Sequence, residues 1–205
     1  MGRKRGVARH GCNYENPESF RDPLRARQAL LTLAAMEITL IAAMSEDGFI
    51  ARDGRIPWHL PKDIQHFREY CAGKTLLIGR KTFEEMNGWF HDHFPIVLTR
   101  QAGYPASPGR AVSTLVAALD LARGRGVSEL VVLGGGEIFV ATAGIADQLV
   151  LTTVRAKLGR DTPFPVQKFS GWNEISAQSF AADSDHAFGF TIRHFSNPKP
   201  NPHAT

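Results

Sequence analysis

One carboxylate stands alone among apolar side chains in the segment from Ile56 to Phe67, which reads Ile-Pro-Trp-His-Leu-Pro-Lys-Asp-Ile-Gln-His-Phe. Pro61 predicts the start of a helix, because a proline in the first turn lacks only an N–H that has no partner there. Asp63 then lies in the first turn, where the positive end of the helix dipole stabilises its charge. The pattern predicts a carboxylate that faces an apolar pocket. For an aspartate considered in isolation, a purely electrostatic role at the helix start is the commoner case.

Cations and hydroxyls follow two predicted strands, 75–78 and 96–98, at the points where the strands end. The residues are Gly79, Arg80, Lys81 and Thr82 after the first strand, and Thr99 and Arg100 after the second. Backbone N–H groups at a helix start form an anion site, and charged donors strengthen it. Each residue alone fits a solvated strand end, but together they predict a site for a phosphate monoester.

Three glycines, Gly134, Gly135 and Gly136, separate a predicted strand at 130–133 from a helix that begins at Glu137. Glycine allows backbone torsions that are closed to other residues and lets the chain approach a ligand closely. Alone, this triplet is weak evidence, because many turns are rich in glycine.

The composition indicates one globular domain, since 205 residues with 43% hydrophobic content can bury a sizeable core. No apolar run approaches the length of about 20 residues that spans a bilayer, so we expect a soluble protein with no membrane partner. Only Cys12 and Cys71 occur, without the neighbours of a metal site. Two cysteines form no disulfide framework, so we expect a reducing cytoplasm and no metal.

The net charge of +4 is concentrated at the N-terminus. Residues 1–35 hold seven lysines and arginines against three acidic residues, and the two signs balance in the remainder. A neutral folded part must hold an anion through a local cluster. We therefore expect no nucleic-acid partner.

Strands and helices alternate along the chain after residue 36. Apolar runs typical of strands buried on both faces occur at 38–43, 75–78, 96–98, 130–133 and 148–154. Helices are predicted at 61–71, 81–86, 114–123 and 137–143, and a C-terminal hairpin at 172–179 and 188–195. The fold class is α/β, with a central, mostly parallel mixed sheet flanked by helices and an antiparallel hairpin at one edge.

Three parts are expected along the chain: a basic, disordered extension at 1–35, a folded domain at 36–195, and a disordered tail at 196–205 that holds three prolines. Met36 precedes the first predicted strand and is a candidate natural start, which would make the extension dispensable.

Five blocks of the sequence carry a family resemblance. They are Ile-Thr-Leu-Ile-Ala-Ala-Met-Ser-Glu-Asp-Gly-Phe-Ile from Ile38, Ile-Pro-Trp-His-Leu-Pro-Lys-Asp from Ile56, Ile-Gly-Arg-Lys-Thr-Phe-Glu from Ile78, Ile-Val-Leu-Thr-Arg from Ile96, and Val-Val-Leu-Gly-Gly-Gly-Glu-Ile-Phe from Val131. In this order and at these separations, they closely resemble dihydrofolate reductase from Glu37 to Phe195. The resemblance implies the single-domain fold of that family and a monomer.

The resemblance also implies NADPH as the cofactor, with the cations after the two strands on its 2′-phosphate and the glycines at its pyrophosphate. In relatives, the first two glycines are joined by a cis peptide, and Phe139 stands where a tyrosine is frequent near the nicotinamide. The implied cofactor-binding residues are Ala43, Ile50, Gly79, Arg80, Lys81, Thr82, Thr99, Arg100, Gly134, Gly135, Gly136, Glu137, Ile138 and Phe139.

The implied reaction is reduction of 7,8-dihydrofolate to 5,6,7,8-tetrahydrofolate, with hydride transfer to C6 and protonation at N5. By resemblance, the catalytic residues are Asp63, which binds the 2-amino group and N3, Trp58, near which a water delivers the proton, and Thr152, which hydrogen-bonds the carboxylate. Residues 45–57 would form a mobile lid, held by Asp161. The implied substrate-binding residues are Ile41, Ala42, Ile56, Asp63, Ile64, Phe67, Met86, Phe90, His93, Leu133 and Thr152.

His93 departs from the family pattern, because relatives carry an arginine there that grips the α-carboxylate of the substrate. Histidine lacks the planar fork of arginine and is only partly charged near neutral pH. We therefore expect weakened recognition of the glutamate tail, or a pteridine with another tail, unless Arg68 compensates.

Other functions stay open. The first is NADPH-dependent reduction of another pteridine or of a ribosylated pyrimidine, although such pyrimidine reductases usually lack the Pro-Trp-x-x-Pro-x-Asp block. The second is a dinucleotide-binding module without catalysis, which a replaced Asp63 would have favoured.

Overall fold

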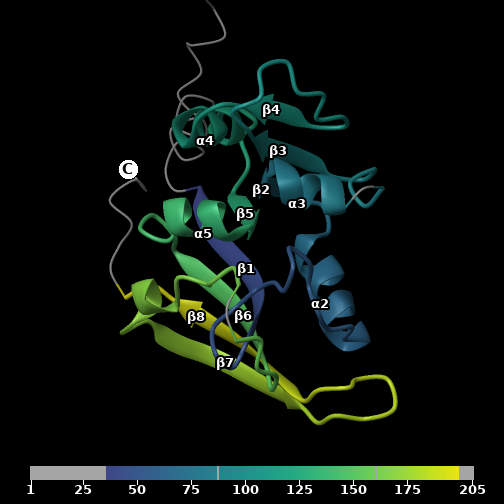
Figure 1. The fold of residues 1–205 in the computed structure, drawn as a ribbon. Helices are drawn as coiled ribbons and strands as arrows, with labels where there is room; N and C mark the ends of the chain where they lie inside the picture. The colour runs from purple at the N-terminus through teal and green to yellow at the C-terminus, as the bar shows by residue number, and fades with distance from the viewer. Residues whose placement is uncertain (1–35, 87, 160, 199–205) are drawn as a thin grey trace, which may run out of the picture.

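The computed structural model describes residues 36–86, 88–159 and 161–198, in which eight strands form one sheet in the order β4-β3-β2-β5-β1-β6-β8-β7 (Figure 1). All neighbours from β4 to β6 run parallel, whereas β8 runs antiparallel to β6 and to β7. The strands are β1 (Glu37–Ser45), β2 (Thr75–Gly79), β3 (Phe94–Leu98), β4 (Arg110–Val112), β5 (Glu129–Gly134), β6 (Gln148–Val154), β7 (Asn173–Phe180) and β8 (Phe190–Ser196). The predicted fold class is confirmed.

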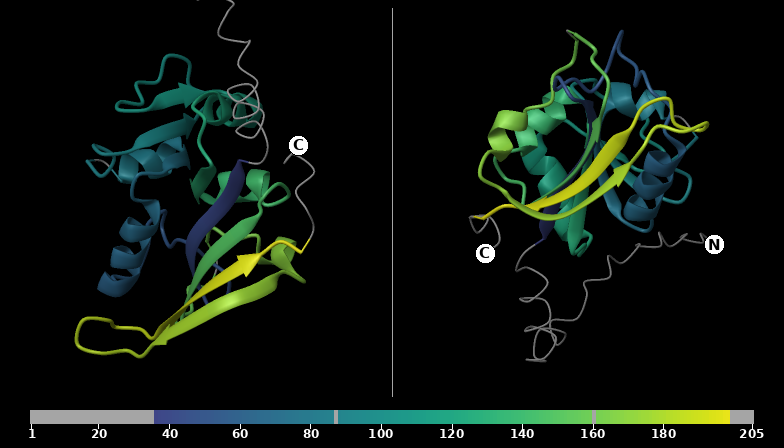
Figure 2. Two further views of the ribbon diagram at one scale, coloured as in Figure 1. Left: turned by 180° about the vertical axis from the view of Figure 1, so that it is seen from behind. Right: turned by 90° about the horizontal axis from the view of Figure 1, so that it is seen from below.

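Helices cover both faces of the sheet. They are α2 (Pro61–Cys71), α3 (Arg80–Glu85), α4 (Leu115–Gly124), α5 (Gly136–Thr142) and the 3-10 helix η2 (Val166–Phe169). Successive strand residues point to opposite faces, so Leu77 joins the apolar core under α4 and α5, while Leu76 and Ile78 join the core under α2 and α3. The two layers of helices are seen from behind and from below in Figure 2.

The predicted elements coincide with the observed ones to within two residues at each end, and those for α2 and β6 match at both ends. Two short elements were not predicted, β4 and η2. β4 has three residues, none of them fully buried, and pairs only with β3 at the sheet edge. It therefore lacks the apolar run that marked the other strands.

The expected N-terminal extension lies outside the described residues, as does the expected 196–205 tail from residue 199 onward. Before that point the chain is anchored: β8 includes Ser196, and the Asn197 side-chain Nδ2 donates to the Ala146 carbonyl oxygen at 3.0 Å. Within the described ranges, no helix has both the length and the apolar character needed to cross a membrane.

The carboxylate of Glu129 on β5 ties the end of α2 to the sheet. Its Oε1 accepts hydrogen bonds from Thr39 Oγ1 at 2.7 Å and from Tyr70 Oη at 2.8 Å, and its Oε2 lies 2.7 Å from Lys74 Nζ. Burial acts to raise the pKa of Glu129, whereas the hydrogen bonds from Lys74, Thr39 and Tyr70 act to lower it. The lowering effects are larger together, so the pKa lies below its ordinary value. The charged form is therefore the one that stabilises the fold.

We predict that Glu129→Gln lowers the free energy of unfolding at pH 7 by about 1–3 kcal/mol, because a charged acceptor is lost. The pKa of Glu129 is lower in the folded protein than its value of 4.5 in the unfolded chain, so the carboxylate stabilises the fold above pH 4.5. This stabilisation is lost as the pH falls through the folded pKa. The difference between the variant and the unaltered protein should therefore shrink below pH 4.5. Urea unfolding at neutral and acidic pH measures it, and an equal difference at both would contradict the assignment.

Candidate active site

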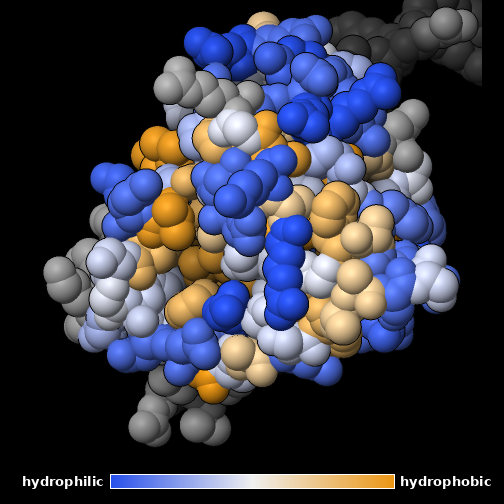
Figure 3. All heavy atoms as spheres, turned by 60° about the horizontal axis from the view of Figure 1, so that its bottom comes forward, coloured by the Kyte–Doolittle hydropathy of each residue, from blue (hydrophilic) through white to orange (hydrophobic). Residues whose placement is uncertain are grey.

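A cleft of about 1220 Å³ opens where the parallel strands end. Its wall includes Gly79 at the end of β2, Thr99 after β3 and Gly135 after β5, together with side chains from the segment before α2 and from α2 itself. Ligands of open α/β sheets bind at the carboxyl ends of the strands. The volume exceeds the roughly 300–1,000 Å³ of a pocket for one small ligand. The molecule is hollowed next to apolar surface in Figure 3, with hydrophilic side chains around it.

Asp63 is a half-buried acid of this cleft and lies in the first turn of α2, as the proline at the helix start predicted. Its Oδ1 accepts a hydrogen bond of 2.6 Å from Thr152 Oγ1 on β6, a hydroxyl that is 3% exposed. Burial raises the pKa of Asp63 above the ordinary value, although the Thr152 hydrogen bond and the charge of His66 act in the opposite direction. Hydrogen-bond donors on a ligand, or a nearby proton, would therefore stabilise this carboxylate.

Around Asp63, the cleft wall is apolar. Trp58 and Phe67 are both half-buried and line the cleft, and the Phe67 ring lies 5.1 Å from the Trp89 ring between centroids. Apolar surroundings lower the local polarity, which strengthens the electrostatic effect of the Asp63 carboxylate.

Cations gather at the other end of the cleft. Gly79 pairs with Leu98 across β2 and β3, which brings the residues that follow these strands side by side. Lys81 and Arg100 are exposed and line the cleft, whereas the Arg80 guanidinium is engaged by both Glu84 carboxylate oxygens at 2.9 Å. Lys81 and Arg100 are therefore better placed than Arg80 to meet an anion.

The glycine triplet packs too closely for side chains. Gly134 has φ +89°, and a Cβ added there would lie 2.5 Å from the Phe139 ring. A Cβ on Gly136 would lie 2.7 Å from Thr162. The Gly134-Gly135 peptide is cis, as the resemblance implied, and Gly135 precedes the first turn of α5. Backbone groups at this turn can thus approach a ligand closely.

The predicted lid is fixed at two points. Asp47 accepts hydrogen bonds from the backbone N–H groups of Leu158 and Gly159, and the Ser45 hydroxyl donates to it as well. The Ser45 hydrogen bond is the main reason that the Asp47 pKa falls to about 2. Asp161, the expected latch, accepts from the Asp53 N–H.

Most of the predicted site residues lie together in the cleft wall. They are Ile41, Ala42, Ala43, Ile50, Ile56, Trp58, Asp63, Ile64, Phe67, Gly79, Arg80, Lys81, Thr82, Met86, Thr99, Arg100, Leu133, Gly135, Gly136, Glu137, Ile138, Phe139 and Thr152. Gly134, Phe90 and His93 are not part of that wall. Gly134 is buried behind Phe139, consistent with its close contact to that ring.

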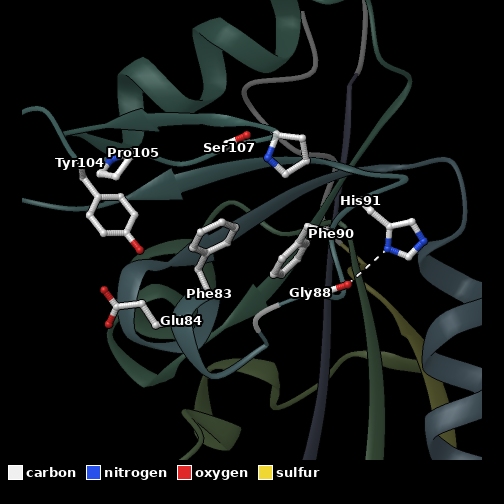
Figure 4. A pocket seen from close by; sticks show the side chains of 9 residues that line it. Phe83, Glu84, Gly88, Phe90, His91, Tyr104, Pro105 and Ser107 are labelled. Atoms are coloured by element: carbon white, nitrogen blue, oxygen red, sulfur yellow. Dashed lines mark hydrogen bonds between the residues drawn. The ribbon is translucent and has the colours of Figure 1, made fainter.

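Phe90 and His93 lie elsewhere. Phe90 is 3% exposed and stacks on Phe83, 4.9 Å between centroids, at a second cavity of about 520 Å³ (Figure 4). His93 stacks on Trp89 at 4.3 Å with both ring nitrogens buried. Burial is the main cause that lowers the pKa of His93 below its ordinary value, so its ring is neutral at pH 7. Trp89 thus occupies the cleft wall where Phe90 was expected.

Sequence reasoning missed Trp89 and His66 as cleft residues. His66 follows Asp63 by three residues on α2, and helical spacing could have placed both on one face. Trp89 lies in an irregular segment, where no periodicity tells which of two adjacent aromatic rings turns inward.

Fold and cleft together define a class: single-sheet α/β proteins with a large cleft at the strand ends, one end of it cationic and the other built around a half-buried carboxylate. The family profile described as dihydrofolate reductase matches residues 37–197. The chain belongs to the dihydrofolate reductase family.

Individual relatives agree with this family. Dihydrofolate reductase type 3 of Salmonella typhimurium is 34% identical over 153 residues, which covers 75% of this chain and 93% of the relative. Dihydrofolate reductase HdrB of Haloferax volcanii is 33% identical over 175 residues, 82% of this chain and 87% of the relative. The solved structure of dihydrofolate reductase from Enterococcus faecalis, complexed with NADP(H) and RAB-propyl, superimposes with a TM-score of 0.72 at 27% identity and covers 80% of this chain and 97% of that one.

We predict that Gly134→Ala lowers the free energy of unfolding by about 2–4 kcal/mol, because the added methyl meets the Phe139 ring and the backbone has a left-handed φ. Gly144→Ala is the matched control, since a Cβ there meets nothing within 4 Å. Thermal and urea unfolding measure both variants. Equal stability of the two variants would contradict the prediction, because it would show that the backbone at Gly134 accepts a methyl group at no cost.

Proposed function

We propose that this protein catalyses the NADPH-dependent reduction of 7,8-dihydrofolate to 5,6,7,8-tetrahydrofolate. The observation that carries the proposal is the half-buried Asp63 carboxylate, held by Thr152 in a cleft of about 1220 Å³. Family membership supports the same reaction.

Asp63 would orient the pteridine. Its two oxygens can accept hydrogen bonds from the 2-amino group and N3, and its negative charge raises the proton affinity of N5 in a cleft with little water. Thr152 fixes the carboxylate through the bond to Oδ1. Trp58 lies in the same wall, where it can hold the water that delivers the proton.

The cationic end of the cleft fits the nucleotide cofactor. Lys81, Thr99 and Arg100 would hold the 2′-phosphate, and the chain at Gly135 and Gly136 would lie against the pyrophosphate, where the close packing leaves no space for side chains. NADPH supplies the hydride when it is bound. Residues 45–57 would close as a lid over the nicotinamide and keep water away from the reacting atoms.

We further propose weak recognition of the glutamate tail. His93 stacks on Trp89, and its lowered pKa disfavours the charged ring that an ion pair with a carboxylate needs. Arg68 is exposed and lines the cleft, so it is the cation available to the tail. The same observation favours a second candidate, reduction of a pteridine with a shorter or uncharged tail.

We also propose that residues 36–195 form the catalytic unit without residues 1–35, and that the protein works as a monomer in the cytoplasm. Cys71 supports a reducing compartment, because it is a free, buried thiol whose pKa burial raises to about 12.

We predict that Asp63→Asn lowers kcat for dihydrofolate at least about 100-fold, because the group that supports protonation is lost. NADPH binding, followed by protein fluorescence, should persist. The pKa of Asp63 is raised in the folded protein, so its charged form lowers the free energy of unfolding above the unfolded pKa. Asp63→Asn should therefore be no less stable than the unaltered protein at pH 7. Asp92→Asn, at an exposed carboxylate, is the control. Turnover by Asp63→Asn within about tenfold of the unaltered protein would contradict the role of Asp63.

For the tail, we predict that His93→Ala changes the KM for dihydrofolate by less than about threefold, whereas Arg68→Gln raises it by about three- to tenfold. A dihydropteridine without a glutamate tail should be insensitive to both changes. Steady-state kinetics with both substrates measure the His93→Ala and Arg68→Gln variants, with Arg123→Gln on α4 as the control. A large effect of His93→Ala on dihydrofolate alone would show that His93 does contact the tail.

A further inference from the structure

A histidine from the C-terminal hairpin caps the helix that carries Asp63. α2 has no side-chain cap from its own N-cap residue, Leu60, and Pro61 has no N–H, so the first backbone donor of the helix is Lys62. The Lys62 N–H donates to His186 Nε2 at 3.2 Å, across 124 residues of sequence. An orphan donor of the first turn is thus satisfied from another element.

The ring of His186 is held from its other side. Its side chain is 2% exposed, and Nδ1 lies 2.6 Å from Asp183 Oδ1, which also accepts the His186 backbone N–H at 2.9 Å. A carboxylate accepts, so Nδ1 carries the hydrogen, and Nε2 is left with the lone pair that Lys62 requires. The surroundings therefore select the neutral tautomer that can act as a cap.

The charged groups around this contact are few. Lys62 Nζ lies 4.0 Å from Asp183 Oδ2 and 5.5 Å from the centre of the Phe180 ring, and Asp185 donates its backbone N–H to Asp183. Phe190 lies 5.6 Å from the His186 ring between centroids. Within the described residues, His186 is thus anchored by one carboxylate and packed against one aromatic ring.

The same hairpin also supports the second anchor of Asp63. β8 pairs with β6, and Ile192 lies opposite Thr152, whose hydroxyl holds the Asp63 side chain. The turn between β7 and β8 reaches the start of α2 (Figures 1 and 2). One antiparallel pair therefore fixes both the backbone before Asp63 and the partner of its carboxylate.

We infer that His186 is a positioning residue, which caps α2 through Lys62 and thereby holds the Asp63 carboxylate at the depth that the pteridine requires. This role rests on the proposed function, because it places Asp63 against that substrate. His186 itself does not line the cleft.

Two amide substitutions isolate the contact. In His186→Gln, the side-chain oxygen can reach the place of Nε2 and accept from Lys62. In His186→Asn, the shorter side chain reaches Asp183 but not Lys62. The same substitution at an exposed position, His91→Asn, is the control.

We expect His186→Asn to lower kcat/KM for dihydrofolate about tenfold, the factor that corresponds to one lost helix-cap hydrogen bond. Both kcat and the KM for dihydrofolate should change, whereas the Kd for NADPH stays within about twofold, because the cofactor residues lie on other elements. His186→Gln should recover most of the loss. Hydrogen exchange should show faster exchange at the Lys62 amide in His186→Asn than in His186→Gln.

Equal kinetics and equal Lys62 exchange in the Asn and Gln variants would overturn the assignment. A loss of NADPH affinity in His186→Asn as large as its loss of kcat/KM for dihydrofolate would also overturn it, because it would indicate a general loosening of the structure. The exchange measurement needs no substrate. If the unaltered protein does not reduce dihydrofolate but Lys62 exchange still separates the two variants, the cap is supported and the proposed reaction is overturned.

Discussion

The structure depends on keeping one ionisable carboxylate inside an apolar wall. Burial of Asp63 raises its pKa, so the charged form is less favourable there than it would be in water. The fold supplies partial compensation at fixed points: the dipole of α2, the Thr152 hydroxyl on β6 and the charge of His66. The carboxylate is thus held in place although burial acts against its charge.

The two ends of the cleft are built in different ways. The cationic end consists of strand ends and tight backbone turns, which the parallel sheet places by its own geometry. The end that holds Asp63 consists of side chains from α2 and from the irregular segment after α3, where Trp89 stacks on His93. The two ends are therefore positioned by different elements of the fold.

Much of this followed from the sequence, because the strands are buried on both faces and read as continuous apolar runs. Pro61 predicted the start of α2, and the apolar residues near it predicted the apolar surroundings of Asp63. Counting along the chain placed His93 at the arginine position, but no pattern indicated that a tryptophan ring would cover it. Phe90 and Trp89 are adjacent, and only packing decides which one turns to the cleft. The contact between His186 and Lys62 joins residues 124 apart, a separation at which single-sequence patterns carry no signal.

The order of the strands has a consequence for synthesis on the ribosome. β8 is the last strand of the sheet to be made, yet it lies between β6 and β7 and pairs with both. A nascent chain can assemble the parallel strands as they emerge. It cannot close the edge of β6 or cap α2 until the final hairpin leaves the exit tunnel. Chains cut short before that hairpin would lack both the strand that pairs with β6 and the histidine that contacts the start of α2, so the setting of Asp63 depends on the last strand of the sheet.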